Sequence, residues 1–225
     1  MRCYGLLFNL LNKGGIQTRK EDALKILFDC AVKYNENLIG KNLLFICIDS
    51  SKKIHSLEMN FLTSNFLHLT GVKFPKASRL SPHSFFDKCL KKRLRITEFE
   101  FATDGTTEKK LSVLPLLLSK NLSANMVGDF SARTPVLVTE KLAGNIKGCI
   151  GFIYDDRKHF YVPNTVLNLD IRTYISNQQR VIAVYRKEKS EPEYRELVYK
   201  AKNINWSAIS YPVEFDYISK PDFTP

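Results

Sequence analysis

The sequence predicts an α+β domain in which N-terminal helices pack on a mainly antiparallel sheet of four or five strands. Segments with helical periodicity lie mostly in the first half of the chain, and short β-type runs separated by Gly, Asn, Asp or Pro follow in the second half. These runs are too close together for crossover helices, which favours antiparallel pairing. Helices first and strands later is the order typical of α+β folds.

Residues 1–50 are expected to form an N-terminal extension of one helix and one strand, packed on a main domain of residues 51–225. Thr18 and Glu21 match a capping box, and apolar residues at helical spacing continue that helix to about residue 37. Residues 42–49 form a short apolar, β-rich run, which predicts a buried strand. Residues 54–61 alternate imperfectly and are expected to form a second strand paired with it.

Two further helices are expected before the sheet. Ser81 and Pro82 match a hydroxyl N-cap followed by proline at the first helical position, and the apolar stripe that follows extends to Leu94. A second helical segment, 106–120, is expected to bend or end near Pro115. The predicted strands of the second half are 126–130, 136–139, 146–154, 159–162 and 180–187, and a final helix is predicted at 193–202.

The composition is that of a folded protein of the cytoplasm. Hydrophobic residues make up 44% of the 225 residues and aromatic residues 12%, which excludes disorder as the main state. The cysteines are five, widely spaced and without a CxxC pair, which argues against a disulfide framework and favours a reducing compartment. Residues 1–11 are too weakly apolar for a secretory signal, and no apolar run approaches the roughly 20 residues that cross a bilayer, so no membrane partner is expected.

The formal charge of +11 is concentrated in one stretch. Residues 52–95 hold ten bases and two acids, whereas residues 155–225 hold eleven bases and ten acids. A basic block beside a neutral remainder is typical of a protein that contacts phosphate backbones, and the alternative is a solvated helix face. The residues expected to contact nucleic acid are Lys73, Lys76, Arg79, Lys88, Lys91, Lys92, Arg95 and Arg133.

The segment around His68 is the most unusual in chemical terms. His68 stands between apolar residues at the head of the basic block, and Thr70 and Gly71 follow it. An imidazole transfers protons near neutral pH, and a neighbouring hydroxyl can orient it or donate to a phosphoryl oxygen. The alternative is a core histidine bonded to a backbone carbonyl. The four histidines show no metal-ligand spacing, and no nucleotide-binding loop motif is present, so neither a metal nor a cofactor is expected.

Seven segments, in chain order, resemble a known nuclease family: NFLHLTGV (65–72), SPHSFFDKCL (81–90), KKLSVLPLL (109–117), MVGDF (126–130), KGCIGF (147–152), YVPNTVLNLDIR (161–172) and VIAVYRK (181–187). They are similar to the phage-encoded barnase–EndoU–colicin–RelE-like nucleases (PBECR), and in particular to the fourth subgroup. The resemblance runs from about residue 60 to residue 187. It implies N-terminal helices against a four-stranded antiparallel sheet, and metal-independent RNA cleavage in toxins or phage–host conflict.

The resemblance also implies site residues. The positions inside its motifs are His68, Thr70, Lys110, Asn164 and Thr165, with Tyr161 and Arg172 as weaker candidates. Thr165 stands where the family more often has serine, and it keeps the hydroxyl. Two alternatives stay open: Asn164 and Thr165 after Pro163 as a turn and helix cap, and Lys110 as an exposed helix lysine.

Three functions remain as hypotheses. In the first, the protein is a ribonuclease in which His68 transfers protons, Lys110 or a lysine of the basic block stabilises the phosphorane, and Asn164 and Thr165 orient the phosphate. In the second, it is a non-catalytic RNA-binding protein or phage inhibitor. In the third, it is an interaction module that blocks a host or defence protein. The sequence indicates no oligomeric state.

Overall fold

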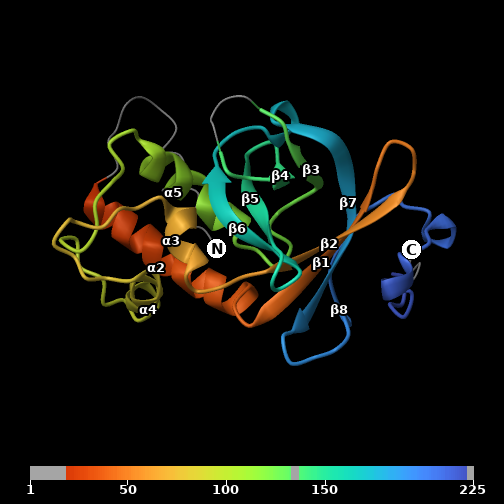
Figure 1. Ribbon diagram of the computed structural model, residues 1–225, viewed down its shortest axis with the longest axis horizontal. Helices are drawn as coiled ribbons and strands as arrows, with labels where there is room; N and C mark the ends of the chain where they lie inside the picture. Colours follow the sequence, from red (N-terminus) through yellow and green to blue (C-terminus); the bar gives the residue numbers. More distant parts are fainter. Residues whose placement is uncertain (1–18, 133–136, 222–225) are drawn as a thin grey trace.

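A computed structural model describes residues 19–132 and 137–221. The helices gather at one end of a large sheet, and the C-terminal segment lies toward the other end (Figure 1). The predicted α+β class is confirmed. Thr18, Arg133 and Val136, which belong to predicted features, lie outside the described residues.

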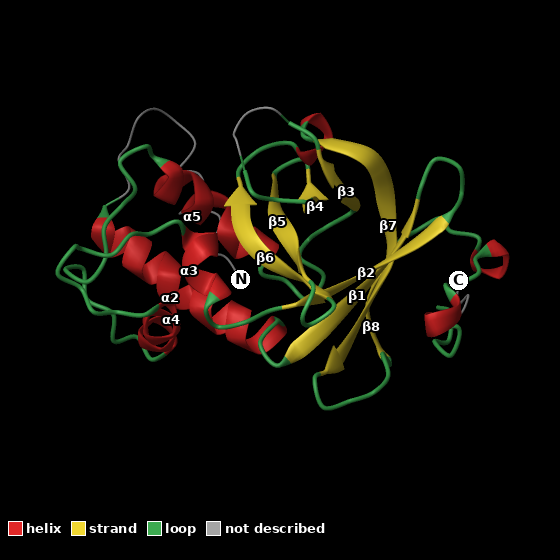
Figure 2. Ribbon diagram, viewed as in Figure 1, coloured by secondary structure: helices red, strands yellow, loops and turns green. Residues whose placement is uncertain are grey.

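The chain passes between helices and strands three times: α2 precedes β1 and β2, α3–α5 follow, and β3–β8 come last (Figure 2). The helices are α2 (Lys20–Asn37), α3 (Asn65–Thr70), α4 (Pro82–Leu90) and α5 (Thr106–Leu117). The strands are β1 (Lys41–Ile48), β2 (Ile54–Asn60), β3 (Met126–Phe130), β4 (Lys141–Asn145), β5 (Gly148–Asp155), β6 (Phe160–Leu167), β7 (Ile175–Glu188) and β8 (Glu196–Lys200). Short 3-10 turns are η1 (Ile171–Thr173), η2 (Trp206–Ala208) and η3 (Val213–Phe215).

The sheet is larger than predicted, with eight strands rather than four or five, in the order β1-β2-β6-β5-β4-β3-β7-β8. β1 also pairs with β7, so seven strands close into a ring and β8 extends it at β7. All pairings are antiparallel except that of β2 with β6, which is one parallel pair between Met59 and Tyr161. The prediction fell short because β7 is 14 residues long and pairs with three strands, which no local pattern reveals.

The helix and strand expected in residues 1–50 are present as α2 and β1. β1 pairs along its length with β2 on one side and with β7 on the other, so it lies within the sheet. Six of its eight residues are buried, since α2 and its neighbours cover one face and the C-terminal segment covers the other. A division of the chain at residue 50 stays a prediction, and one continuous sheet crosses that point.

Two apolar clusters lie on the two faces of β1. Leu43 and Phe45 join the larger cluster, which also holds the buried faces of all four helices. Leu44 and Ile46 point the opposite way and pack with the C-terminal segment, whose buried residues include Trp206. This alternation follows from the two-residue period of a strand. It explains why the run 42–49 is apolar at nearly every position.

Two predicted elements differ from the structure, and a third agrees with it. Residues 137–139 are not a strand, and the strand instead begins at Lys141. Residues 193–202 contain β8 rather than a helix, because the free edge of β7 offers backbone partners that outweigh weak helix propensity. The helix expected to bend or end near Pro115 is α5, which continues through Pro115 and ends two residues later, at Leu117, as predicted. None of the described helices is long and apolar enough to span a bilayer.

Candidate active site

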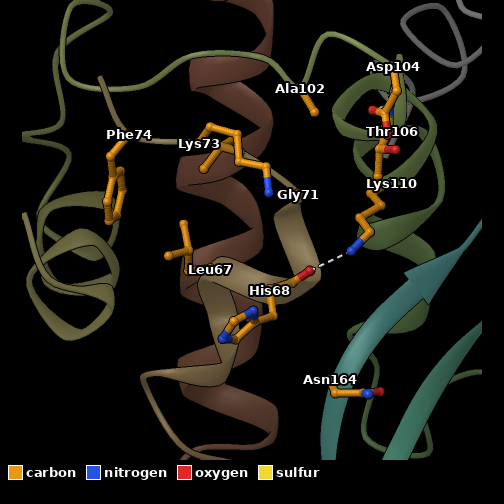
Figure 3. Close-up of a pocket in the computed structure, with 11 residues that line it drawn as sticks. Leu67, His68, Gly71, Lys73, Phe74, Ala102, Asp104, Thr106, Lys110 and Asn164 are labelled. Atoms are coloured by element: carbon orange, nitrogen blue, oxygen red, sulfur yellow. Dashed lines mark hydrogen bonds between the residues drawn. The ribbon is translucent and has the colours of Figure 1, made fainter. Parts of the chain in front are cut away.

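A pocket of about 340 Å³ opens between α3, α5 and β6. It brings together His68, Lys110 and Asn164, three of the five residues implied by the family resemblance (Figure 3). Its wall consists of Leu67, His68, Gly71, Val72, Lys73, Phe74, Ala102, Asp104, Thr106, Lys110 and Asn164. Residues separated by about 100 positions in the chain therefore share one site.

The short helix α3 places His68 on the rim. Phe66 and Leu69 are fully buried in the core, and this fixes the opposite face of the helix toward solvent, where His68 is exposed. The helix ends at Gly71, which caps it in the left-handed conformation at φ +71° and donates to the Leu67 carbonyl at 3.2 Å. The alternative of a core histidine is therefore wrong.

Thr70 does not reach the pocket. Its side chain is fully buried, and the hydroxyl donates to the Leu67 carbonyl at 2.8 Å and accepts from the Val72 amide at 3.4 Å. Both bonds stay within the end of α3. In this structure Thr70 shapes the turn that positions His68, and its predicted contact with substrate has no support from the geometry.

Lys110 enters the pocket from α5. Its Nζ donates to the backbone carbonyl of His68 at 2.7 Å, the bond drawn as a dashed line in Figure 3. Burial of the ammonium group, and secondly the positive charge of Lys73, lower the pKa of Lys110 to about 8, while Asp104 opposes this shift. The side chain is thus a cation that can exchange its proton close to neutral pH, rather than an ordinary exposed helix lysine.

Gly71 makes room for that lysine. A Cβ added at this glycine would lie 2.8 Å from Lys110 Cδ, closer than carbon atoms approach without displacement. Thr107, in α5, fixes the backbone at Gly71. Its hydroxyl donates to the Gly71 carbonyl at 2.7 Å and accepts from the Ala102 amide at 2.8 Å. The side chain of Thr107 is completely buried. One hydroxyl therefore ties together the segments on either side of the pocket.

Asp104 and Thr106 also line the pocket, and neither was predicted as a site residue from the sequence. Asp104 accepts from the Thr106 amide at 2.9 Å at the start of α5. Hydrogen bonds from Thr106 lower the pKa of this carboxyl, so Asp104 is ionised at neutral pH. An aspartate two residues before a helical segment is a local signal that could have identified them.

Asn164 faces the pocket from a bulge in β6. Gly151 pairs with Thr165 and Phe152 pairs with Pro163, which leaves Asn164 as the extra residue of the bulge. Its amide donates to the Val138 carbonyl, and its oxygen accepts from the Thr139 hydroxyl at 3.2 Å. The alternative of a turn and helix cap is wrong, because Asn164 lies within a strand.

Thr165 does not line the pocket. It is only 8% exposed and packs against the open face of Gly151, where an added Cβ would lie 2.7 Å from its methyl group. Tyr161 and Arg172, the weaker candidates, are also absent from this wall. Arg172 forms an exposed ion pair with Asp170 at 2.6 Å.

The eight residues expected to contact nucleic acid fall into distinct groups. Lys73 lines the pocket. Three others form ion pairs with acids of the same region: Lys88 with Glu98, Lys91 with Asp87, and Arg95 with Glu98. Lys76, Arg79 and Lys92 are exposed and form no ion pair within the described part of the chain. Arg133 lies outside the described residues.

Within the described residues, no group of three or more His, Cys, Asp or Glu side chains is placed to hold a metal ion. The helices pack at one end of a mainly antiparallel sheet, and a lysine and a histidine line one pocket, which defines an α+β protein with a candidate site between α3, α5 and β6. A family model described as phage-Barnase-EndoU-ColicinE5/D-RelE like nuclease 4 matches residues 26–203. The chain belongs to this nuclease-like family, which confirms the resemblance and its subgroup. No curated protein and no solved structure matches the chain.

Proposed function

We propose that this protein is a metal-independent endoribonuclease of phage or mobile-element origin that cleaves RNA at the pocket of His68 and Lys110. Membership of a nuclease-like family supports a nuclease-type activity. The observation that carries the choice of site is the 2.7 Å bond from Lys110 Nζ to the His68 backbone carbonyl, which holds a titratable amine at the backbone of a residue whose imidazole is exposed. This pairing supplies the two kinds of group that cleavage without a metal requires.

In the proposed reaction the ribose 2′-oxygen attacks the adjacent phosphorus and the bond to the 5′-oxygen breaks. His68 accepts the proton of the 2′-hydroxyl, and an acid returns a proton to the leaving oxygen, so the products are a 2′,3′-cyclic phosphate and a 5′-hydroxyl. Lys110 stabilises the negative phosphorane as a cation, with Lys73 as a second positive charge at the same pocket. DNA lacks the nucleophile and is left intact.

Asn164 has a narrower role in this proposal. Its NH2 group donates to the Val138 carbonyl and its oxygen accepts from the Thr139 hydroxyl, so it positions the pocket wall and keeps one N–H for phosphate. We further propose that the activity serves as a toxin or in phage–host conflict, with RNA as the target.

The test is incubation of purified protein with end-labelled RNA in excess chelator, followed by analysis of the new ends. We expect cyclic phosphate ends, and loss of cleavage in His68→Ala. His159→Asn is the matched control, because His159 is exposed in a turn at φ +57° and does not line the pocket. Intact RNA after prolonged incubation, or equal cleavage by His68→Ala, would overturn the proposal.

One observation favours a second candidate function, RNA binding without turnover. Within residues 19–132 and 137–221, no side chain hydrogen-bonds to the His68 imidazole, so nothing there selects its tautomer. A catalytic histidine usually has such a partner. This function predicts salt-dependent RNA binding with the RNA recovered intact.

A further inference from the structure

A second hollow lies at the end of the strand ring that is remote from the helices. It has a volume of about 920 Å³, within the range of ligand pockets, and shares no residue with the His68 pocket. It is lined by Ile48, Asp49, Ser50, His55, Asp129, Lys141, Asn177, Gln178, Gln179 and Arg180. The β1–β2 turn that forms one side of it projects away from α2–α5 in Figure 1.

Two side-chain pairs stand at this hollow, one between His55 and Asp49 and one between Lys141 and Asp129. His55 Nε2 lies 2.7 Å from Asp49 Oδ2, and both side chains are about one quarter to one third exposed. Across the ring Lys141 bonds to Asp129, which also accepts from the Asn177 amide at 2.7 Å. Asp49 directly follows β1 and His55 lies in β2, whereas Asp129 and Lys141 lie in β3 and β4.

The carboxylates of the hollow are already satisfied. Besides His55, Asp49 accepts from the Ser51 amide at 2.9 Å, the Ser51 hydroxyl at 2.7 Å and the Lys53 amide at 3.0 Å. The hydrogen bond from His55, followed by those from Ser51, holds the pKa of the Asp49 carboxyl well below its usual range. These acceptors are therefore committed to the protein itself.

The donors are not. Lys141 uses one of its three N–H groups, on Asp129, and Arg180 uses one of its five, on the Lys202 carbonyl at 2.8 Å. Within the described chain, His55 Nδ1 and the side-chain amide of Gln179 have no hydrogen-bond partner. A polar hollow with committed acceptors and spare cationic donors favours a ligand rich in acceptors and negative in charge.

We propose that this hollow is a binding site for a nucleoside phosphate. Lys141, Arg180 and the His55 ring donate to the phosphate oxygens, and the amides of residues 177–179 contact the edge of the base. The site goes beyond the proposed cleavage pocket, because none of its residues takes part there. It accepts the phosphate of a free nucleotide or of an RNA end, which carry the same chemistry.

The experiment is a calorimetric titration of the full chain with 5′-AMP at low salt. We expect saturable binding that weakens at least tenfold in Arg180→Gln and in the double variant Asp129→Asn/Lys141→Met. The double variant removes both charges of one pair, so it leaves no unpaired charge in the hollow. Lys147→Met is the matched control, because Lys147 is exposed just beyond the opposite end of β4. Thermal unfolding of each variant checks that the fold is retained.

Two RNA hexamers, one with a 5′-phosphate and one with a 5′-hydroxyl, distinguish the sources. Tighter binding of the phosphorylated hexamer than of 5′-AMP identifies an RNA end, and the reverse identifies a free nucleotide. Absence of saturable 5′-AMP binding, or a loss of binding in Lys110→Met with no loss in the hollow variants, would overturn the proposal. The titration measures binding and needs no turnover. The binding proposal can therefore hold even if the protein does not cleave RNA.

Discussion

Lys110 Nζ donates to the backbone carbonyl of His68 across 42 positions of the chain, at 2.7 Å. This bond joins α5 to α3 and brings an ammonium group to the base of an exposed histidine. The partner is a carbonyl oxygen, which leaves the imidazole ring itself open to the pocket. The bond therefore fixes α5 against the backbone of α3, and it leaves the imidazole of His68 free to contact a ligand.

Replacing Lys110 with methionine is expected to lower RNA cleavage about 100-fold, the usual effect of removing one group that stabilises an oxyanion. Met keeps the apolar stem beside Gly71, so the fold should persist. Single-turnover cleavage rates measure the effect. Lys109→Met is the control, because Lys109 is the exposed neighbour on the same helix and does not line the pocket. Equal losses in the two variants would contradict a role specific to Lys110.

The cleavage rate is expected to fall as the pH rises through about 8. The pKa of Lys110 is lowered to about 8, so above that pH the amine loses its proton and the charge that stabilises the phosphorane. A pH–rate profile from pH 6 to 9.5 measures this limb. A limb that persists unchanged in Lys110→Met would show that another group titrates.

Gly71→Ala is expected to damage the site through contact, whereas Gly105→Ala is expected to cost only backbone strain. Both glycines have positive φ, +71° and +73°, which costs a non-glycine residue about 1–2 kcal/mol. An added Cβ would meet Lys110 only at Gly71, since nothing lies within 4 Å at Gly105. Urea unfolding should show similar losses of stability, and cleavage should fall in Gly71→Ala alone. Equal cleavage by both variants would show that the position of Lys110 is unimportant.

Thr107→Val is expected to lower the free energy of unfolding by about 1–3 kcal/mol, because it leaves the Gly71 carbonyl and the Ala102 amide without their partner. Valine matches the shape of threonine, so packing is preserved. Urea unfolding measures the change. Thr173→Val is the control: its hydroxyl bond to the Asp170 carbonyl is exposed, and its loss should be near zero. A neutral Thr107→Val would contradict the bridging role.

Stability is expected to decline in alkali because buried thiols resist ionisation. Burial raises the pKa of Cys149 to about 12, from an ordinary thiol value of 9.0. Between these two values the unfolded chain has lost the proton that the native chain keeps, so the free energy of unfolding falls as the pH rises. By pH 10 one thiol contributes about 1.4 kcal/mol to this fall. Denaturant unfolding at pH 8 and pH 10 should show a smaller decline in Cys149→Ala than in wild type. An identical decline would refute the assignment.

Local patterns predicted the elements whose signals lie within one segment. Ser81 caps α4 as expected, accepting from the Ser84 amide at 3.1 Å, with Pro82 in the first turn. The apolar run 42–49 forms the buried strand β1. His68, Lys110 and Asn164, which the family motifs single out, line one pocket, and their role there stays a prediction. Thr70 and Thr165 do not line it, because their burial depends on the packing of α3 and on the bulge of β6.

The sequence by itself determined the α+β class, the helix α4, the strand β1 and the family to which the chain belongs. Only the tertiary structure decided that β1 closes a ring with β7, that residues 196–200 form a strand, and that Lys110 faces the backbone of His68. The physical reason is the range of the forces involved. Capping and periodicity act within a few residues, whereas strand pairing and the burial of a charge depend on partners that only the folded chain brings together.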